Sequence, residues 1–390
     1  MKIIIGADTY YPNIDGASYF TQRLAEQLVL RGHEVLVIAP GKSFNDIYST
    51  HNQVNILGVS SWPSGFHKDY CFSLPFGLLK HLEPVVLNFK PDVIHVQGHF
   101  FVENALIQIA KKNHLPIVAT NHFMPDNLTH YVALPKKIKK LLNNLLWWHF
   151  KRNFSKLPII TTPTKTAANV LKKIGLTQEI IPLSCGIDMK KFNPNNNSDY
   201  LKKRHNLPNK PTILVVNRLS PEKHVDTVLR AVAELKKNID IHFIVAGNGN
   251  ERQNLENLAK NLNISNNVTF LGYVSDEDLP FVYPLANIFV MAGTAELQSL
   301  VTMEAMATSL PVVAANALAL PELVYPNENG FLFNDNNYLE LANYLKQLLE
   351  NSDLRQKFGQ ESLEIIKKHD VSTTILAFEK LYQEAQTNHF

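Results

Sequence analysis

The chain has 390 residues, of which 45% are hydrophobic, so it is long enough and apolar enough for two domains with separate cores. It has no apolar run of 18 residues, and its N-terminus is typical of a first β-strand, which argues against a transmembrane helix and a signal peptide. The net charge of +3 is unevenly spread, because the 52 residues between Asp126 and Glu179 include ten Lys or Arg and no Asp or Glu.

The first half alternates short β-rich runs with amphipathic helical patterns, which is typical of parallel strands connected by helices. Five segments are predicted to be buried strands: Lys2–Ala7, Glu34–Ala39, Val93–Val96, Ile117–Thr120 and Ile159–Thr162. Four segments are predicted to be helices: Tyr19–Arg31, Phe76–Asn88, Asn104–Asn113 and Lys136–Asn153. Gly32 is expected to end the first of these helices.

The second half repeats this alternation. Its predicted strands are Thr212–Val216, Ile241–Ala246, Val268–Leu271, Ile288–Met291 and Pro311–Ala314. Its predicted helices are Val225–Lys237, Glu251–Asn261, Asp276–Tyr283, Leu300–Thr308 and Tyr338–Asn351. The sequence therefore predicts an α/β protein with two doubly wound parallel-sheet domains, residues 1–185 and 211–370, joined by a polar linker at 186–210. A ligand is expected in the cleft between them, outside the carboxyl ends of the strands.

Two candidate site residues follow predicted strands of the first half. Gly16 lies in the loop after the first strand, where a residue without a side chain lets a backbone N–H approach a phosphate closely. His122 follows the strand Ile117–Thr120 and is placed to contact a sugar or a leaving group. An ordinary turn glycine and a structural histidine remain the alternatives for these two positions.

Two cations follow the strand Thr212–Val216. Arg218 offers a bidentate fork and Lys223 a compact charge, which together suit a diphosphate. Cations near a helix start oppose the helix dipole, so their position favours a function over a solvated surface.

Two carboxylates, Glu296 and Glu304, stand eight residues apart where the predicted strand Ile288–Met291 gives way to a helix. The N–H groups of such a helix start form an anion site, whereas carboxylates beside it are suited to bind hydroxyl groups. A phosphate flanked by hydroxyl-bearing rings describes a nucleotide sugar. The Asp276-Glu-Asp278 triplet follows Ser275 and is predicted to cap a helix and not to bind a metal. No cofactor is expected.

Taken together and in this order, these segments resemble the family-4 retaining glycosyltransferases (glycosyl transferases group 1) of the GT-B fold, and bacterial lipid glycosyltransferases among them. The resemblance extends over nearly the whole chain. It rests on the two glutamates, the two cations and the Gly16 loop, and on Ser184-Cys-Gly-Ile-Asp188, Phe192-Asn-Pro194 and Ala319-Leu-Pro-Glu-Leu-Val324.

The resemblance implies a role for each candidate. Gly16, Arg218, Lys223 and the backbone N–H groups of Leu300 and Val301 would hold the donor diphosphate. Tyr273, Val274 and Glu304 would hold the nucleotide, with Glu304 on the ribose. His122, Glu296, Gln298 and Ser299 would contact the sugar, and His122, Glu296, Arg218 and Lys223 would form the catalytic set. The last helix, within residues 371–390, would cross back to the first domain.

The resemblance also implies retention of the anomeric configuration, with no protein nucleophile and no metal. Cations and N–H dipoles would stabilise the negative charge that develops on the departing diphosphate. Gln298-Ser299 replaces the family's usual Phe-Gly, which leaves the identity of the sugar open. UDP is expected as the donor nucleotide in preference to GDP, and a hexose such as the glucose of UDP-glucose as the sugar.

The basic stretch indicates the acceptor. Along a helix over Lys136–Arg152, the apolar set Ile138, Leu141, Leu142, Leu145, Leu146 and Trp148 is predicted to face the core. Lys136, Lys137, Lys139, Lys140 and Lys151 would lie on the opposite face, with Trp147 among them. Basic residues near anionic lipid contribute about 1 kcal/mol each, and tryptophan favours membrane interfaces. A solvated basic face is the alternative.

The sequence thus predicts a cytoplasmic enzyme, peripheral on the inner face of the membrane, that moves a hexose to a lipid such as diacylglycerol or a glycolipid in glycolipid biosynthesis. A soluble sugar, glycan or protein acceptor is the main alternative, and a non-catalytic nucleotide-sugar-binding protein is a weaker one. Nucleic acid is not an expected partner, because no nucleic-acid motif accompanies the basic residues. The oligomeric state is left open.

Overall fold

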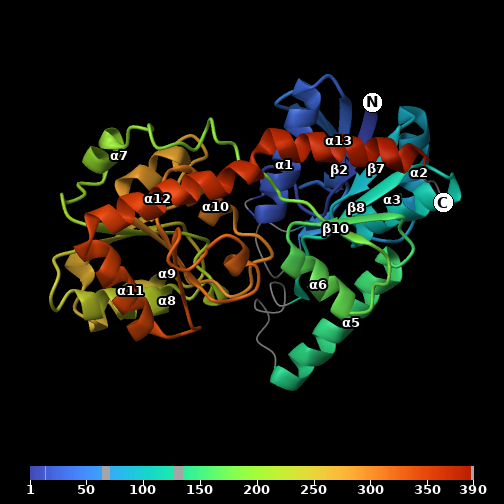
Figure 1. Ribbon diagram of the computed structural model, residues 1–390. Helices are drawn as coiled ribbons and strands as arrows, with labels where there is room; N and C mark the ends of the chain where they lie inside the picture. The colour runs from blue at the N-terminus through green and yellow to red at the C-terminus, as the bar shows by residue number, and fades with distance from the viewer. Residues whose placement is uncertain (14, 64–70, 126–134, 388–390) are drawn as a thin grey trace. The chain divides into compact units, whose positions relative to one another are not determined.

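The computed structural model describes residues 1–390 except 14, 64–70, 126–134 and 388–390. The chain divides into two compact units. Unit 1 comprises residues 1–185 and 372–390, and unit 2 comprises residues 186–371. Each unit is built around a largely parallel sheet covered by helices (Figure 1).

The sheet of unit 1 has eight strands in the order β10-β9-β8-β7-β1-β2-β4-β3, and only β3 runs antiparallel to its neighbour. The strands are β1 Lys2–Gly6, β2 Glu34–Pro40, β3 Ile47–His51, β4 Val54–Val59, β7 Val93–Val96, β8 Ile117–Thr120, β9 Ile159–Thr162 and β10 Ile180–Pro182. A separate hairpin joins β5 Trp62–Pro63 to β6 Cys71–Phe72. The helices are α1 Gly16–Leu30, α2 Leu78–Phe89, α3 Phe101–Lys112, α5 Lys136–Phe154, α6 Lys165–Lys173 and α13 Val371–Thr387.

The sheet of unit 2 has six parallel strands in the order β13-β12-β11-β14-β15-β16. They are β11 Thr212–Val216, β12 His242–Ala246, β13 Val268–Gly272, β14 Ile288–Met291, β15 Val312–Ala315 and β16 Gly330–Phe333. The α-helices are α7 Asp199–Arg204, α8 Val225–Leu235, α9 Arg252–Asn261, α10 Leu300–Ala307, α11 Tyr338–Glu350 and α12 Ser352–Ile366.

The sequence predictions capture the central strands of both sheets, since these are continuous runs of buried residues. The outer strands β3, β4, β10 and β16 were not predicted. The helix predicted over Asp276–Tyr283 is wrong: two short 3₁₀ turns form instead, η3 Leu279–Phe281 and η4 Tyr283–Leu285. Each turn has a proline near its start, Pro280 and Pro284, and a proline lacks the N–H that a longer helix needs.

Residues 186–210, which the sequence suggests to be a linker, belong to unit 2 in the structure. Ile187, Phe192 and Leu201 from this segment are buried in the core of that unit. The apolar side chains within an otherwise polar segment therefore fix it to the domain that follows.

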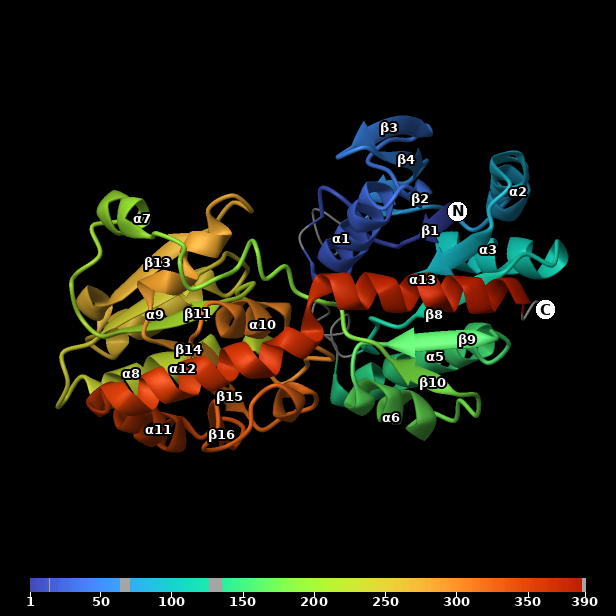
Figure 2. The same ribbon diagram turned by 45° about the horizontal axis from the view of Figure 1, so that its top comes forward.

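The last helix belongs to unit 1, and Figure 2 shows α13 running along that unit. Glu379 accepts hydrogen bonds from Arg31 Nε at 2.8 Å and His33 Nε2 at 2.7 Å. Phe378 packs against Phe20 of α1, with ring centroids 5.8 Å apart. These contacts attach the end of the chain to its beginning.

Candidate functional site

The loop after β11 carries both predicted cations. Arg218 lies just beyond the strand, and its Nη2 is 3.3 Å from Glu222 Oε1. The same carboxylate oxygen accepts a hydrogen bond from Ser220 Oγ at 2.6 Å. Burial raises the pKa of Glu222, but the hydrogen bonds from Ser220 and from its own backbone, with the charges of Arg218 and Lys223, outweigh burial and leave it lowered. An ionised Glu222 thus holds Arg218 at the carboxyl end of the sheet.

Lys223 and Glu296 are brought together by two different loops. Lys223 Nζ donates to Glu296 Oε1, and both side chains are mostly buried. Gly293 makes this approach feasible, because a Cβ atom at that position would lie only 3.0 Å from Glu296 Oε1. The Thr294 N–H donates to the Glu222 carbonyl oxygen at 3.3 Å and ties the two loops to each other. A cation and a carboxylate therefore share one site where β11 and β14 end.

The N-terminus of α10 lies at the end of the same segment. Ser299 is its N-cap, and the Ser299 hydroxyl accepts from the Thr302 N–H at 3.4 Å and bonds to Thr302 Oγ1 at 2.8 Å. The first-turn amides of Leu300 and Val301 have no partner within the helix by the geometry of any helix start, so they favour an anion. Ser299 is only 2% exposed and caps the helix, and its predicted contact to the sugar stays a prediction.

Glu304 lies one turn into α10 and is held by a residue that the sequence analysis missed. The Tyr283 hydroxyl donates to Glu304 Oε2, and both side chains are buried. Burial, followed by the charge and hydrogen bond of Glu304, raises the pKa of Tyr283 well above its ordinary value, so the phenol keeps its proton. Tyr283 thereby fixes the orientation of the carboxylate. Its position in a predicted helix concealed this role.

Tyr273 and Val274 directly follow β13, and Tyr273 is 56% exposed. Together with seven other residues they line a hollow of about 120 Å³. The Arg204–Asp278 ion pair, with Nη1 and Oδ2 2.7 Å apart, forms one of its sides. Asp278 of the metal-like triplet is thus paired with an arginine. Its backbone N–H donates to Ser275 Oγ at 3.2 Å, although the helix that Ser275 was predicted to cap does not form.

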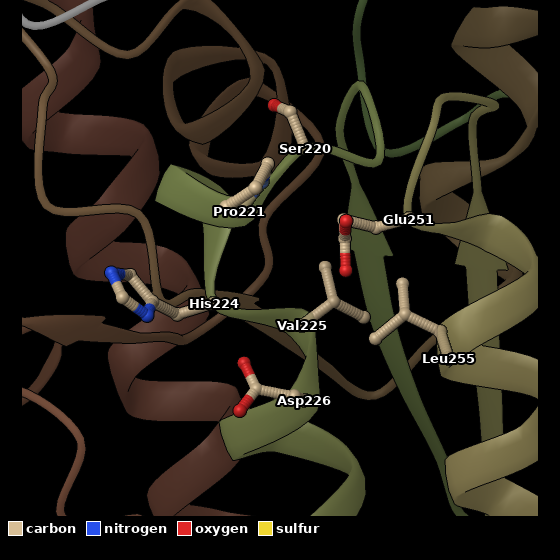
Figure 3. Close-up of a pocket in the computed structure, with 7 residues that line it drawn as sticks. All are labelled: Ser220, Pro221, His224, Val225, Asp226, Glu251 and Leu255. Carbon is tan, nitrogen blue, oxygen red and sulfur yellow. The ribbon is translucent and has the colours of Figure 1, made fainter. Parts of the chain in front are cut away.

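A larger hollow of about 290 Å³ lies beside the β11 loop and the start of α8 (Figure 3). Ser220, Pro221, His224, Val225, Asp226, Glu251 and Leu255 line it. The two carboxylates in this lining, Asp226 and Glu251, disfavour a diphosphate. None of the predicted site residues lines this hollow. Within the described part of the chain, no group of three or more His, Cys, Asp or Glu is arranged to hold a metal ion.

Gly16 is the first residue of α1 in unit 1. Asp15 caps this helix, with its Oδ1 accepting from the Ser18 N–H at 2.9 Å. Among the residues that the structure describes, none would lie within 4 Å of a Cβ atom added at Gly16. The fold of unit 1 therefore does not itself require glycine here, which leaves room for a ligand beside this backbone.

His122 follows β8 and ends a buried chain of hydrogen bonds. Its Nε2 is 3.0 Å from Gln97 Oε1, and Gln97 Nε2 is 3.2 Å from His95 Nε2. His95 Nδ1 is in turn 2.8 Å from the hydroxyl of Tyr382 on α13. Burial lowers the pKa of His122 to about 4, so the ring is neutral at pH 7. With Nε2–H donating to Gln97, the Nδ1 lone pair remains to accept a hydrogen bond.

A carboxyl pair, of which Glu103 is buried and Asp8 half-buried, lies in the same unit and was not found from the sequence. Asp8 follows β1 and Glu103 lies in α3, and a Cβ atom on Gly98 would be 2.9 Å from Asp8 Oδ2 and 3.1 Å from Glu103 Oε1. Burial raises the pKa of Asp8 to about 6. Burial and the charge of Asp8 raise the pKa of Glu103 well above its ordinary value. The pair therefore retains a proton at neutral pH.

The predicted orientation of α5 is wrong. Trp147, Phe150 and Phe154 face the core of unit 1, whereas Ile138, Leu141, Leu145 and Trp148 are 48%, 70%, 58% and 56% exposed. Trp147 meets Phe150 edge-on and Phe150 stacks on Phe154, so these aromatic rings pack together on the side that faces inward. Of the predicted membrane lysines, Lys137 and Lys140 are exposed and Lys139 is half-buried, while the side chain of Lys136 lies outside the described residues.

His99 is a buried histidine in this aromatic cluster, with ring centroids 4.3 Å from Phe100 and 5.1 Å from Phe150. Burial, and to a lesser degree His149, lowers the pKa of His99 to about 3, from 6.5. Below pH 6.5 the unfolded chain therefore binds a proton at His99 that the folded chain does not bind. The free energy of unfolding consequently decreases as the pH is lowered. Between pH 7 and pH 5, we expect the free energy of unfolding of His99→Phe to decrease by about 2 kcal/mol less than that of the unchanged protein. Urea unfolding of both proteins at the two pH values measures this difference, and an equal loss in both would contradict it.

Two family models match the chain. Residues 14–191 match the model described as Glycosyltransferase Family 4, and residues 197–364 match the model described as Glycosyl transferases group 1. Among curated relatives, the chain is 28% identical over 371 residues to an alpha-monoglucosyldiacylglycerol synthase of Streptococcus pneumoniae. This alignment covers 93% of the chain and 82% of the relative.

Solved structures match over both units. A sucrose-phosphate synthase from Thermosynechococcus elongatus superposes with a TM-score of 0.83 at 18% identity, covering 98% of this chain and 99% of that one. The Anabaena protein Alr3699/HepE in complex with UDP-glucose superposes with a TM-score of 0.77 at 18% identity, covering 98% and 100% of the two chains. Among the residues that the structure describes, none of the helices has the length and apolar character needed to traverse a bilayer.

Proposed function

Because this chain belongs to the family-4 glycosyltransferases (glycosyl transferases group 1), we propose that it transfers a hexose from UDP-hexose to a membrane lipid with retention of configuration and without a metal. It has the GT-B fold of that family. The acceptor we propose is diacylglycerol or a glycolipid, at the inner face of the membrane. Four features support this proposal: the charges around β11, the start of α10, the position of Glu304, and the name of the streptococcal relative.

The observation that carries the proposal is the Lys223–Glu296 pair beside the α10 N-terminus. Cleavage of the bond between sugar and diphosphate leaves negative charge on the diphosphate and positive charge at the anomeric carbon. Lys223, Arg218 and the amides of Leu300 and Val301 are suited to stabilise the first of these charges. Glu296 is suited to accept hydrogen bonds from sugar hydroxyls, with Gln298 beside it.

Without a ligand, Glu296 neutralises Lys223. A bound diphosphate would offer Lys223 a second anionic partner, and the sugar hydroxyls would offer Glu296 new donors. When the donor binds, Lys223 could therefore turn to the diphosphate and Glu296 to the sugar, or the two side chains could stay paired and both contact the donor. Arg218 keeps its own partner, Glu222, and adds positive charge without leaving its place.

The nucleotide would extend from the diphosphate toward Glu304 on the ribose and toward Tyr273 and Val274 at the base. The carboxylate held by Tyr283 is suited to accept from two ribose hydroxyls. UDP is preferred to GDP in this proposal because the Anabaena structural neighbour was solved with UDP-glucose. His122 and Gly16 belong to unit 1, and their roles at the sugar and the diphosphate stay predictions.

The test is a transfer assay with purified protein. Radiolabelled UDP-glucose, UDP-galactose and GDP-mannose are each supplied with vesicles containing diacylglycerol, or with soluble sugars, in the presence and absence of EDTA. We expect a glycolipid product from one UDP-sugar, unchanged by EDTA, with an α-linkage visible in the anomeric proton coupling. Product on soluble sugars alone would assign the soluble-acceptor alternative. Neither transfer nor donor hydrolysis with any donor would overturn the proposed activity.

Gly16 offers a mutational test of the diphosphate site. We expect Gly16→Ala to leave the free energy of unfolding unchanged or to raise it by about 0.4–1 kcal/mol, because the added methyl group meets open space and restricts the unfolded chain. The same methyl group would obstruct the approach of a diphosphate to this amide, so kcat/KM should fall at least about tenfold, or about 1.4 kcal/mol. Thermal melts and initial rates of Gly16→Ala and the unchanged protein measure the two effects. Full activity in a stable Gly16→Ala protein would exclude a close diphosphate contact at Gly16.

A further inference from the structure

The outward face of α5 is apolar, which is the reverse of what a helix on a protein surface normally shows. Ile138, Leu141, Leu145 and Trp148 recur at intervals of three and four residues, so they form one stripe along the helix. We call these four residues the α5 stripe. They are between 48% and 70% exposed, whereas Trp147, Phe150 and Phe154 hold the opposite face against the core. None of the described side chains covers the stripe enough to bury it.

Positive charge surrounds the stripe. Lys137, Lys140 and Lys151 are exposed on the same helix, and the Arg152 guanidinium carbon lies 5.5 Å from the centre of the Trp148 ring. Helix α5 contains no Asp or Glu, and it belongs to the 52-residue stretch without an acidic residue. In Figure 1 the N-terminal half of α5 extends beyond the other labelled helices and strands of unit 1. A single partner could therefore contact the α5 stripe and the basic residues beside it at the same time.

We infer that the α5 stripe is the surface by which this protein binds an anionic lipid bilayer, with α5 lying in the plane of the interface. Leucine, isoleucine and tryptophan would enter the headgroup and upper acyl region, while the lysines and Arg152 would reach lipid phosphates. This inference deepens the proposed function, because a lipid acceptor has to be met at a membrane surface.

Charge also decides against a second copy of the chain as the occupant of this face. A symmetric dimer through the stripe would bring the same basic residues of both copies together, at a cost in repulsion. A bilayer rich in anionic lipid provides the opposite charge and an apolar layer at once.

The experiment measures vesicle binding without donor or acceptor turnover. The full chain is sedimented with vesicles of phosphatidylcholine alone or mixed with equal phosphatidylglycerol. We expect binding to the anionic vesicles that falls as salt is added. The triple variant Leu141→Gln, Leu145→Gln, Trp148→Gln should bind at least about tenfold more weakly, since interfacial binding scales with the apolar area that is buried. The double variant Lys137→Gln, Lys140→Gln should also bind the anionic vesicles about tenfold more weakly. Its binding to phosphatidylcholine vesicles should be unchanged.

A matched control removes apolar exposure elsewhere. Leu30, Leu339 and Leu376 lie on α1, α11 and α13 and are 70%, 55% and 52% exposed. Their triple change to Gln should leave vesicle binding within about twofold, as expected for residues that do not enter the interface. Circular dichroism and thermal melting confirm that each variant is folded.

The outcomes separate this inference from the proposed function. A stripe variant that binds vesicles as well as the unchanged protein, or unchanged protein that ignores both kinds of vesicle, would overturn the inference. Transfer to a short-chain diacylglycerol below its micelle concentration should survive in the stripe variant, while transfer to vesicle lipid should fall with binding. If the protein binds vesicles through the stripe and yet glycosylates no lipid, the proposed function fails and the membrane surface stands.

Discussion

Lys223→Met is expected to lower kcat by about 10²–10³-fold. In the proposed reaction Lys223 contacts the diphosphate as it departs, and removal of one preorganised donor to a developing negative charge typically costs that much. The loss should appear in both kcat and kcat/KM, because the interaction strengthens as the bond breaks. Steady-state rates with a saturating lipid acceptor measure it.

The control for this change is a lysine of similar chemistry away from the site. Lys210 forms an ion pair with Asp240 at 2.8 Å on the surface of the same unit, and Lys210→Met should leave the rate within about twofold, since such surface pairs contribute little. Thermal unfolding must be compared as well, because Lys223→Met leaves Glu296 mostly buried without this partner. A well-folded Lys223→Met protein with unchanged kcat would remove Lys223 from the mechanism.

Binding of inorganic pyrophosphate separates charge stabilisation from a structural effect. Pyrophosphate has neither sugar nor base, so it tests the cation site alone. We expect its affinity to fall in Lys223→Met and to remain unchanged in Lys210→Met. Because Glu296 neutralises Lys223 in the free protein, Glu296→Gln should tighten pyrophosphate binding even as it removes a contact to the sugar.

The sequence predicts a candidate site at one edge of the sheet, because parallel strands carry their loops to the same edge. Arg218 after β11, Tyr273 after β13 and Glu296 after β14 could be located from their strands alone. Which side chains pair could not be predicted in this way. The Lys223–Glu296 contact joins residues 73 positions apart, and it depends on the space left by Gly293. Similarly, Asp8 and Glu103 carry no local pattern that announces their proximity.

The face of α5 shows a different limit. Periodicity finds that a helix has an apolar arc, but α5 has two arcs, and periodicity alone cannot say which one is buried. The aromatic residues Phe150 and Phe154 decide it by fitting between other rings of the core. The exposed arc is what the packing of these rings leaves at the surface, so it cannot be identified from periodicity alone.

Glu304→Gln is expected to weaken the binding of UDP by about 10–100-fold, with a smaller effect on kcat. Hydrogen bonds to a charged group contribute about 1.5–3 kcal/mol, and the ribose hydroxyls would lose the charge of their acceptor. The amide keeps the size of the carboxylate and can still accept from the buried Tyr283 hydroxyl, so folding should be preserved. Isothermal titration with UDP gives the dissociation constant directly.

The pattern over two ligands and two variants is the decisive measurement. Glu304→Gln should weaken UDP and leave pyrophosphate unaffected, because pyrophosphate has no ribose, whereas Lys223→Met should weaken both. Glu364→Gln, which removes a surface carboxylate 2.7 Å from Lys367 Nζ, serves as the matched control and should change neither. Tyr283→Phe should weaken UDP by a factor of about three to ten, since a neutral hydrogen bond that orients Glu304 contributes about 0.5–1.5 kcal/mol. Equal losses of pyrophosphate and UDP affinity in Glu304→Gln would mean that this carboxylate supports the anion site and does not bind the ribose.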